Sequence, residues 1–179
     1  MTQDMRHTLT WQASAREVPK ASTISVSDRA LEDAGALEMA VRHAFWEACE
    51  LLRRDGALMP FTVVCTSSGM EMADHPAASS DEVYEGVKTL LARVAPEAYV
   101  LCYDGSIDAD GRHTDAVVCE AARRGDSEAS LLALPYTIGE NGYVFDDAYA
   151  CVGVTSQLQR RTMSPNARLG AFSGTLLFV

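Results

Sequence analysis

The sequence predicts an α+β fold: an antiparallel or mixed sheet of about 4–6 strands with two main helices packed on one face. Apolar residues recur at helical spacing in two stretches, near 28–55 and 80–95. Short β-branched or apolar runs follow each of them. The order is helix, hairpin, helix and a meander of strands, which lacks the strand–helix alternation of a doubly wound parallel sheet.

The length and composition are those of one globular domain. The chain has 179 residues, of which 47% are hydrophobic and 22% charged, so it can bury a core without disulfides or metal. We expect an N-terminal arm at 1–26, a single α+β domain at 27–155 and a C-terminal extension at 156–179.

The first helix is expected to begin at Ser27-Asp28, where serine suits the N-cap and acidic residues suit the first turn. Its end is expected at Asp55-Gly56, because glycine adopts the left-handed conformation readily. Three residues widen its apolar surface beyond a single stripe, and they suggest contact with a second surface besides the sheet, for which a partner subunit is one candidate: Met39, Trp46 and Cys49.

A hairpin is expected next, from a strand at 61–66 through the turn 67–69 to a second strand near 70–73. The second helix is expected to begin at Ser79, since Ser79 and Glu82 have the spacing of a capping box. Pro96 disfavours helical backbone at the residue before it, so this helix ends by Ala95.

The rest of the domain is predicted to form consecutive strands at 98–103, 115–122 and 129–138, with short strands near 143–145 and 150–154. The middle strands are apolar at nearly every position, which indicates that both faces of the sheet are covered. A second copy of the chain is one way to cover a face, and we expect a homodimer. The apolar end 175–179 is expected to dock on its own domain or on another chain.

Charge and cysteine content exclude several classes of partner. A net charge of -10 and a pI of about 4.8 disfavour nucleic acid and anionic lipid surfaces. The five cysteines are widely spaced, and the N-terminus lacks the features of a secretory signal. We therefore expect a cytoplasmic protein with reduced thiols, no membrane span and no cofactor.

The most acidic segment, 104–115, is the candidate metal site. We expect it to be a turn between two strands that brings Asp104 and Asp115 close together. Carboxylate oxygens are the ligands of hard divalent cations, and a histidine can be an additional ligand or a base. The candidate ligands are Asp104, Asp108, Asp110, His113 and Asp115. The alternative interpretation is that this segment is a solvated turn without a metal site.

Thiol chemistry is a second possibility, with Cys65, Cys102 or Cys119 as nucleophile and His75 or His113 as base. Each cysteine has apolar neighbours in sequence, which favours a role in packing. No phosphate-binding or nucleophile-elbow motif is present. The sequence therefore favours a non-catalytic binding or assembly module that forms a homodimer, with a metal-dependent hydrolase as the alternative and the ligand unknown.

Overall fold

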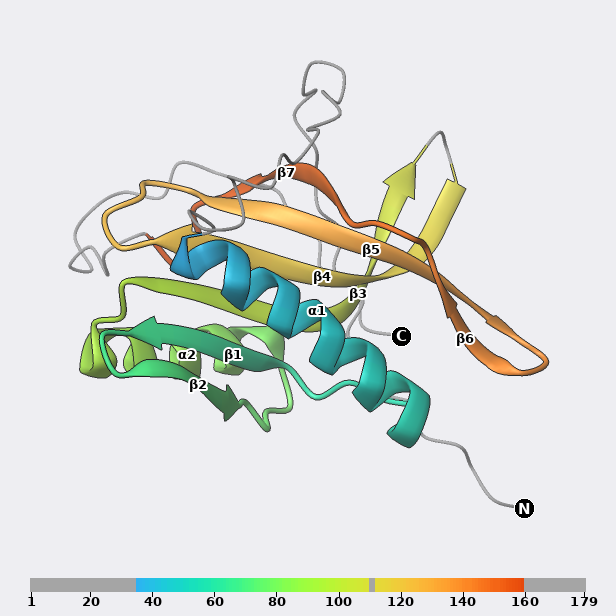
Figure 1. Ribbon diagram of the computed structural model, residues 1–179, viewed down its shortest axis with the longest axis horizontal. Coiled ribbons are helices and arrows are strands. Elements are labelled where there is room, and N and C mark those ends of the chain that lie inside the picture. The colour runs from blue at the N-terminus through green and yellow to red at the C-terminus, as the bar shows by residue number, and fades with distance from the viewer. Residues whose placement is uncertain (1–34, 110–111, 160–179) are drawn as a thin grey trace.

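The computed structural model describes residues 35–109 and 112–159, which form two helices and seven strands (Figure 1). The elements in chain order are α1 Ala36–Asp55, β1 Phe61–Thr66, β2 Gly69–Asp74, α2 Ser80–Val94, β3 Ala98–Ala109, β4 Arg112–Arg123, β5 Ala129–Gly139, β6 Gly142–Phe145 and β7 Ala150–Thr155. This order of helices and strands confirms the α+β class.

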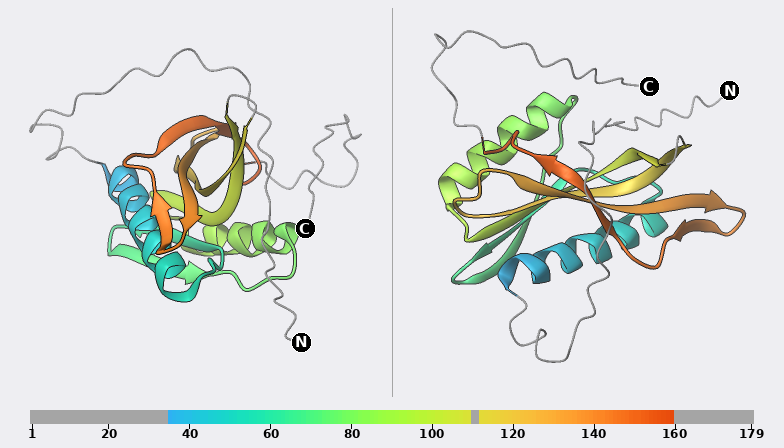
Figure 2. Two further views of the ribbon diagram at one scale, coloured as in Figure 1. Left: turned by 90° about the vertical axis from the view of Figure 1, so that its right-hand side faces the viewer. Right: turned by 90° about the horizontal axis from the view of Figure 1, so that it is seen from above.

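All strand pairs of the described sheet are antiparallel. The strands lie in the order β2-β1-β3-β4-β5-β6, and β7 pairs with β5. The sheet is thus somewhat larger than predicted. It is also strongly curved (Figure 2).

The two helices cover opposite faces of the sheet, whereas the sequence predicted both on one face. Seen from above, the sheet lies between α1 and α2 (Figure 2). Along β3, Ala98, Val100 and Cys102 contact the cluster around α1, while the alternate residues contact the cluster around α2. Side chains of a strand alternate between faces, so strands that are apolar throughout need cover on both sides. Each helix provides it on one side.

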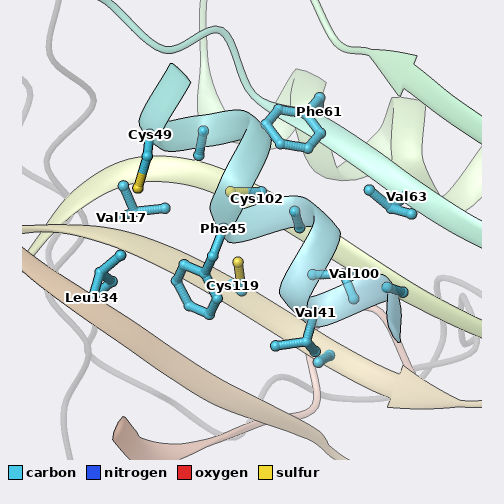
Figure 3. Close-up of a cluster of buried hydrophobic side chains, with 14 of the residues drawn as sticks. Val41, Phe45, Cys49, Phe61, Val63, Val100, Cys102, Val117, Cys119 and Leu134 are labelled. Atoms are coloured by element: carbon cyan, nitrogen blue, oxygen red, sulfur yellow. The ribbon is translucent and has the colours of Figure 1, made fainter. Parts of the chain in front are cut away.

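The α1 side of the core is made of aliphatic, aromatic and thiol side chains (Figure 3). Cys49 points from α1 toward Val117, and Phe45 lies beside Cys119, which is paired with Cys102 across β3 and β4 (Figure 3). The helix ends as predicted, since Gly56 adopts the left-handed conformation and its N–H bonds to the carbonyl of Leu52. Its described start is Ala36 after an extended Gly35, and the predicted cap at Ser27-Asp28 lies outside the described residues.

The α2 side confirms the predicted capping residue. The side chain of Ser79 accepts a hydrogen bond from the backbone N–H of Glu82, and the Glu82 carboxylate accepts one from the N–H of Ala78. Ala95 ends the helix in the left-handed region, with φ 48° and ψ 54°. Neither described helix is both long and apolar enough to cross a bilayer.

The strands β3 and β4 are longer than predicted. Their pairing continues to Ala109 and Arg112, so most of the segment expected to be a turn is a two-stranded ribbon. The predicted hairpin β1–β2 and the short strands β6 and β7 are present. Of the predicted C-terminal extension, Leu158 is buried against the α2 side. The arm 1–26, Asp110 and the apolar end 175–179 lie outside the described residues.

Candidate functional site

The candidate site lies where the sheet divides into two arms. The pairing of β4 with β5 stops at Ala116 and Pro135, while β3–β4 continues on one side and β5–β6 on the other. Pro135 has no N–H to donate, and its carbonyl accepts a hydrogen bond from the N–H of Asp146 on the β6 side. The two arms then diverge (Figure 1).

A half-buried carboxyl group joins the two arms. The hydroxyl of Tyr136, on β5, donates to Oδ1 of Asp104, on β3, at 2.7 Å. Burial raises the pKa of Asp104 to about 6, the hydrogen bond from Tyr136 opposes this shift, and the nearby charge of Asp115 adds to it. Asp104 therefore changes its charge near neutral pH.

Ser106 adds a polar group whose hydrogen bonds are unsatisfied. It is only 3% exposed, and its hydroxyl has no hydrogen-bond partner among the residues that the structure describes. It lies two residues from Asp104 on β3 and directly opposite Asp115 on β4, so all three side chains share the face of the sheet that α1 covers. We call Asp104, Ser106, Asp115 and Tyr136 the fork site.

Aromatic rings line the other arm of the fork. The ring of Tyr136 lies 5.3 Å from that of Tyr143 and 5.6 Å from that of Phe145, measured between centroids. Tyr143 is fixed to the end of α1 through a 2.9 Å bond from its hydroxyl to the carbonyl of Gly56. Arg53 of α1 places its guanidinium 5.0 Å from the centroid of Phe145. The polar fork site is thus continuous with an apolar wall.

The predicted metal ligands are separated into smaller groups. Asp108 pairs with His113 at 3.1 Å on the exposed ribbon, and Asp104 is bonded to Tyr136. Asp104 and Asp115 are near each other but are offset, because Asp115 lies opposite Ser106. Within residues 35–109 and 112–159, no three His, Cys, Asp or Glu side chains are placed to hold a metal ion.

The residues considered for thiol chemistry also lie apart. Cys65 is on the α1 side and donates to the carbonyl of Ala36 at 3.3 Å. His75 is instead 2.7 Å from the hydroxyl of Thr62, with which it forms a buried pair. Burial raises the pKa of both Cys65 and Cys119, which disfavours the reactive thiolate. These cysteines contribute to packing.

A second polar cluster, which the sequence analysis missed, lies on the α2 side. Glu120 of β4 is 1% exposed and accepts hydrogen bonds from the hydroxyls of Tyr84 and Tyr103, the latter at 3.2 Å. Burial raises the pKa of Glu120 to about 7, and the two tyrosine bonds oppose the shift. A single glutamate inside the apolar run 116–122 is the sequence signal that could have revealed it.

The two polar clusters differ in access. Glu120 and its tyrosines are closed off in the core, so that cluster connects α2 to the sheet. The fork site includes the exposed Asp115 and the half-buried Asp104, so a solute can reach its carboxyl groups, while Ser106 and Tyr136 are buried. Comparison with known proteins adds no assignment, since no family model, curated protein or solved structure matches this chain.

Proposed function

We propose that this protein is a non-catalytic binding module and that its ligand contacts the fork site. The observation that carries the proposal is the buried hydroxyl of Ser106, which has no partner among the described residues. A buried polar group without a hydrogen bond costs about 1–3 kcal/mol of stability. A ligand that forms a hydrogen bond with Ser106 would remove this cost, so the buried hydroxyl favours binding.

Metal-dependent hydrolysis at the same residues has less support. Asp104 is bonded to Tyr136, and Asp108 is bonded to His113 at the exposed end of the ribbon. Bringing three of the predicted ligands to one ion would require breaking these pairs. Asp104 and Ser106, by contrast, already share one face of the sheet.

The first test compares the stability of two variants without any ligand. If Ser106 serves binding, Ser106→Ala raises the free energy of unfolding by about 1 kcal/mol, since it deletes an unsatisfied hydroxyl. The matched control is Thr62→Val, which leaves His75 without its partner and lowers stability by about 1–3 kcal/mol. Urea denaturation measures both. A Ser106→Ala variant as unstable as the control would mean that the hydroxyl supports the fold, and would contradict the proposal.

Self-association is a second candidate function, supported by the side of α1 that faces solvent. Trp46 and Met39 are 60% and 49% exposed there, and the ring of His43 stacks on Trp46 with centroids 6.2 Å apart. Arg42 and Glu47 flank these residues. In a parallel pair of helices, charged residues on either side of the apolar contact form salt bridges between the two helices. If two copies pair through α1, Arg42 of one copy would meet Glu47 of the other. A second copy is therefore the occupant we infer.

Light scattering on full-length protein over a range of concentrations tests this candidate. Trp46→Ala is expected to shift the equilibrium to monomer, whereas Met59→Ala, at an exposed residue outside α1, leaves it unchanged. Arg42→Glu is expected to weaken the dimer, and adding Glu47→Arg to restore it. A wild-type protein that is monomeric at every concentration rules the dimer out.

Cytoplasmic residence and the exclusion of nucleic acid stay predictions from composition and charge. The five cysteines are free thiols, four of them buried, which supports a reducing compartment. The net charge of -10 supports the exclusion of nucleic acid.

A further inference from the structure

The fork site collects hydrogen-bond acceptors and negative charge. Asp104 and Asp115 each provide a carboxyl group, and Ser106 provides a hydroxyl between them. Among the described residues, no lysine or arginine forms an ion pair with Asp104 or Asp115. An anion would be repelled at this position, while a cation would be attracted.

The surroundings favour an organic cation over a metal ion. The described residues give no group of three metal ligands. The ring of Tyr136 instead joins the acidic residues to the rings of Tyr143 and Phe145. Arg53 already covers a face of Phe145 and Tyr136 is buried, so the apolar part of a ligand is better placed against the partly exposed Tyr143. The faces of aromatic rings attract ammonium groups through cation–π interactions.

We propose that the fork site binds a primary organic ammonium ion with an apolar body. The ammonium group has three N–H donors, which match Asp104, Ser106 and Asp115, and the body lies against the partly exposed Tyr143. This inference rests on the proposed function, because it names the ligand class of the same site. The two can be tested separately by varying only the charged group of a probe.

The experiment is calorimetric titration of the full-length protein with benzylamine, benzyl alcohol and benzoate, which share one ring and differ in charge. Benzylamine is expected to bind most tightly. Asp104→Asn is expected to weaken it by roughly 10- to 100-fold, the usual range for a lost bond to a charged group. Ser106→Ala is expected to weaken it about tenfold. Asp108→Asn is the matched control, since Asp108 lies on the same ribbon, bonded to His113, and it leaves binding unchanged.

Three results would overturn the ammonium inference. If benzyl alcohol or benzoate binds at least as tightly and Ser106→Ala weakens it, the site binds a ligand of another class and the proposed function stands. If Asp104→Asn and Asp108→Asn weaken benzylamine equally, the attraction is a general effect of charge. If benzylamine does not bind at millimolar concentration, the inference fails, and the ligand-free stability test decides the proposed function. Should Asp104→Asn not fold, Ser106→Ala compared with Asp108→Asn shows whether benzylamine binds at the fork site.

Discussion

Two acidic residues, one on each face of the sheet, illustrate how burial changes the chemistry of a side chain. Asp104 and Glu120 both lie on central strands, and each accepts hydrogen bonds from tyrosine hydroxyls. Burial raises the pKa of Asp104 to about 6 and that of Glu120 to about 7. Because the unfolded chain ionises at lower pH, ionisation of these residues opposes folding near neutral pH.

Glu120→Gln is expected to make stability less dependent on pH. The pKa of Glu120 rises from 4.5 to about 7 on folding, so the wild type loses stability as pH increases from 4.5 to 7, by on the order of 3 kcal/mol. Glutamine keeps an acceptor for the tyrosines and cannot ionise. The two proteins should be similar near pH 4, and the variant more stable at pH 8. Urea denaturation at several pH values measures this.

The control for Glu120 is Glu128→Gln, at an exposed glutamate, whose pH profile should follow that of the wild type. A Glu120→Gln variant that is less stable than the wild type at pH 8 would show that the ionised carboxylate, with its tyrosine bonds, stabilises the fold.

Binding of benzylamine at the fork site is expected to strengthen with pH. The carboxyl group of Asp104 is mostly protonated at pH 5 and mostly ionised at pH 7, since its pKa is about 6, while the amine stays protonated. The affinity should rise by about tenfold over this interval. Asp115 and Tyr136 also face Asp104, and Asp115 adds negative charge. Calorimetry at pH 5, 6 and 7 measures the effect; a profile that is the same in Asp104→Asn would assign it to another group.

At the scale of elements, one end of α2 is stabilised by its terminal residue and the other end is destabilised by its terminal residue. Ser79 caps the first turn with its side chain, as helix N-termini require. At the other end, Ala95 adopts a positive φ of 48°, which is unfavourable for a residue with a Cβ by about 1–2 kcal/mol. Arg124 offsets part of this cost, since its guanidinium donates to the carbonyls of Ala95 and Pro96.

Ala95→Gly is therefore expected to raise the melting temperature, although glycine also adds freedom to the unfolded chain. The net gain should be below about 1 kcal/mol. The matched control is Ala92→Gly, an exposed position within the same helix, which should lower stability by about 1 kcal/mol. Calorimetric melting of both variants checks the prediction. Equal destabilisation by both would mean that Ala95 is not strained.

At the scale of the whole molecule, one sheet separates two cores. The α1 side holds Cys49, Cys102 and Cys119, while the α2 side holds Glu120 and its tyrosines. The central strands contribute alternate residues to both. Opening either core therefore disturbs strands that the other core needs, and we expect the described domain to unfold cooperatively.

Thiol labelling of the native protein tests this cooperativity. Cys151 is exposed, and the other four cysteines are buried, so a thiol reagent at neutral pH should modify one cysteine quickly and four slowly. The four slow rates should be similar, because each requires global opening. Cys151→Ser should remove only the fast phase. A second fast cysteine, or four very different rates, would show that one core opens without the other.

The sequence by itself determined the type and order of the helices and strands, because interactions between residues close together in the chain specify them. Helical spacing, the Ser79 cap, Gly56 and Pro96 marked where the helices end, and the apolar runs marked the strands. These signals depend on residues close together in the chain. The prediction failed where local signals mislead: the strand segments 104–109 and 112–115 contain aspartate and glycine, yet pairing with each other keeps them extended.

Only the tertiary structure decided what the elements do together. It placed the helices on opposite faces, which accounts for the apolar strands without requiring a second subunit. It also divided the predicted metal ligands, since register put Asp104 near Tyr136 and Asp108 opposite His113. Tyr136 is 32 residues from Asp104, and Tyr84 is 36 from Glu120. Such contacts depend on how strands align and which face a helix covers, and no local pattern encodes either.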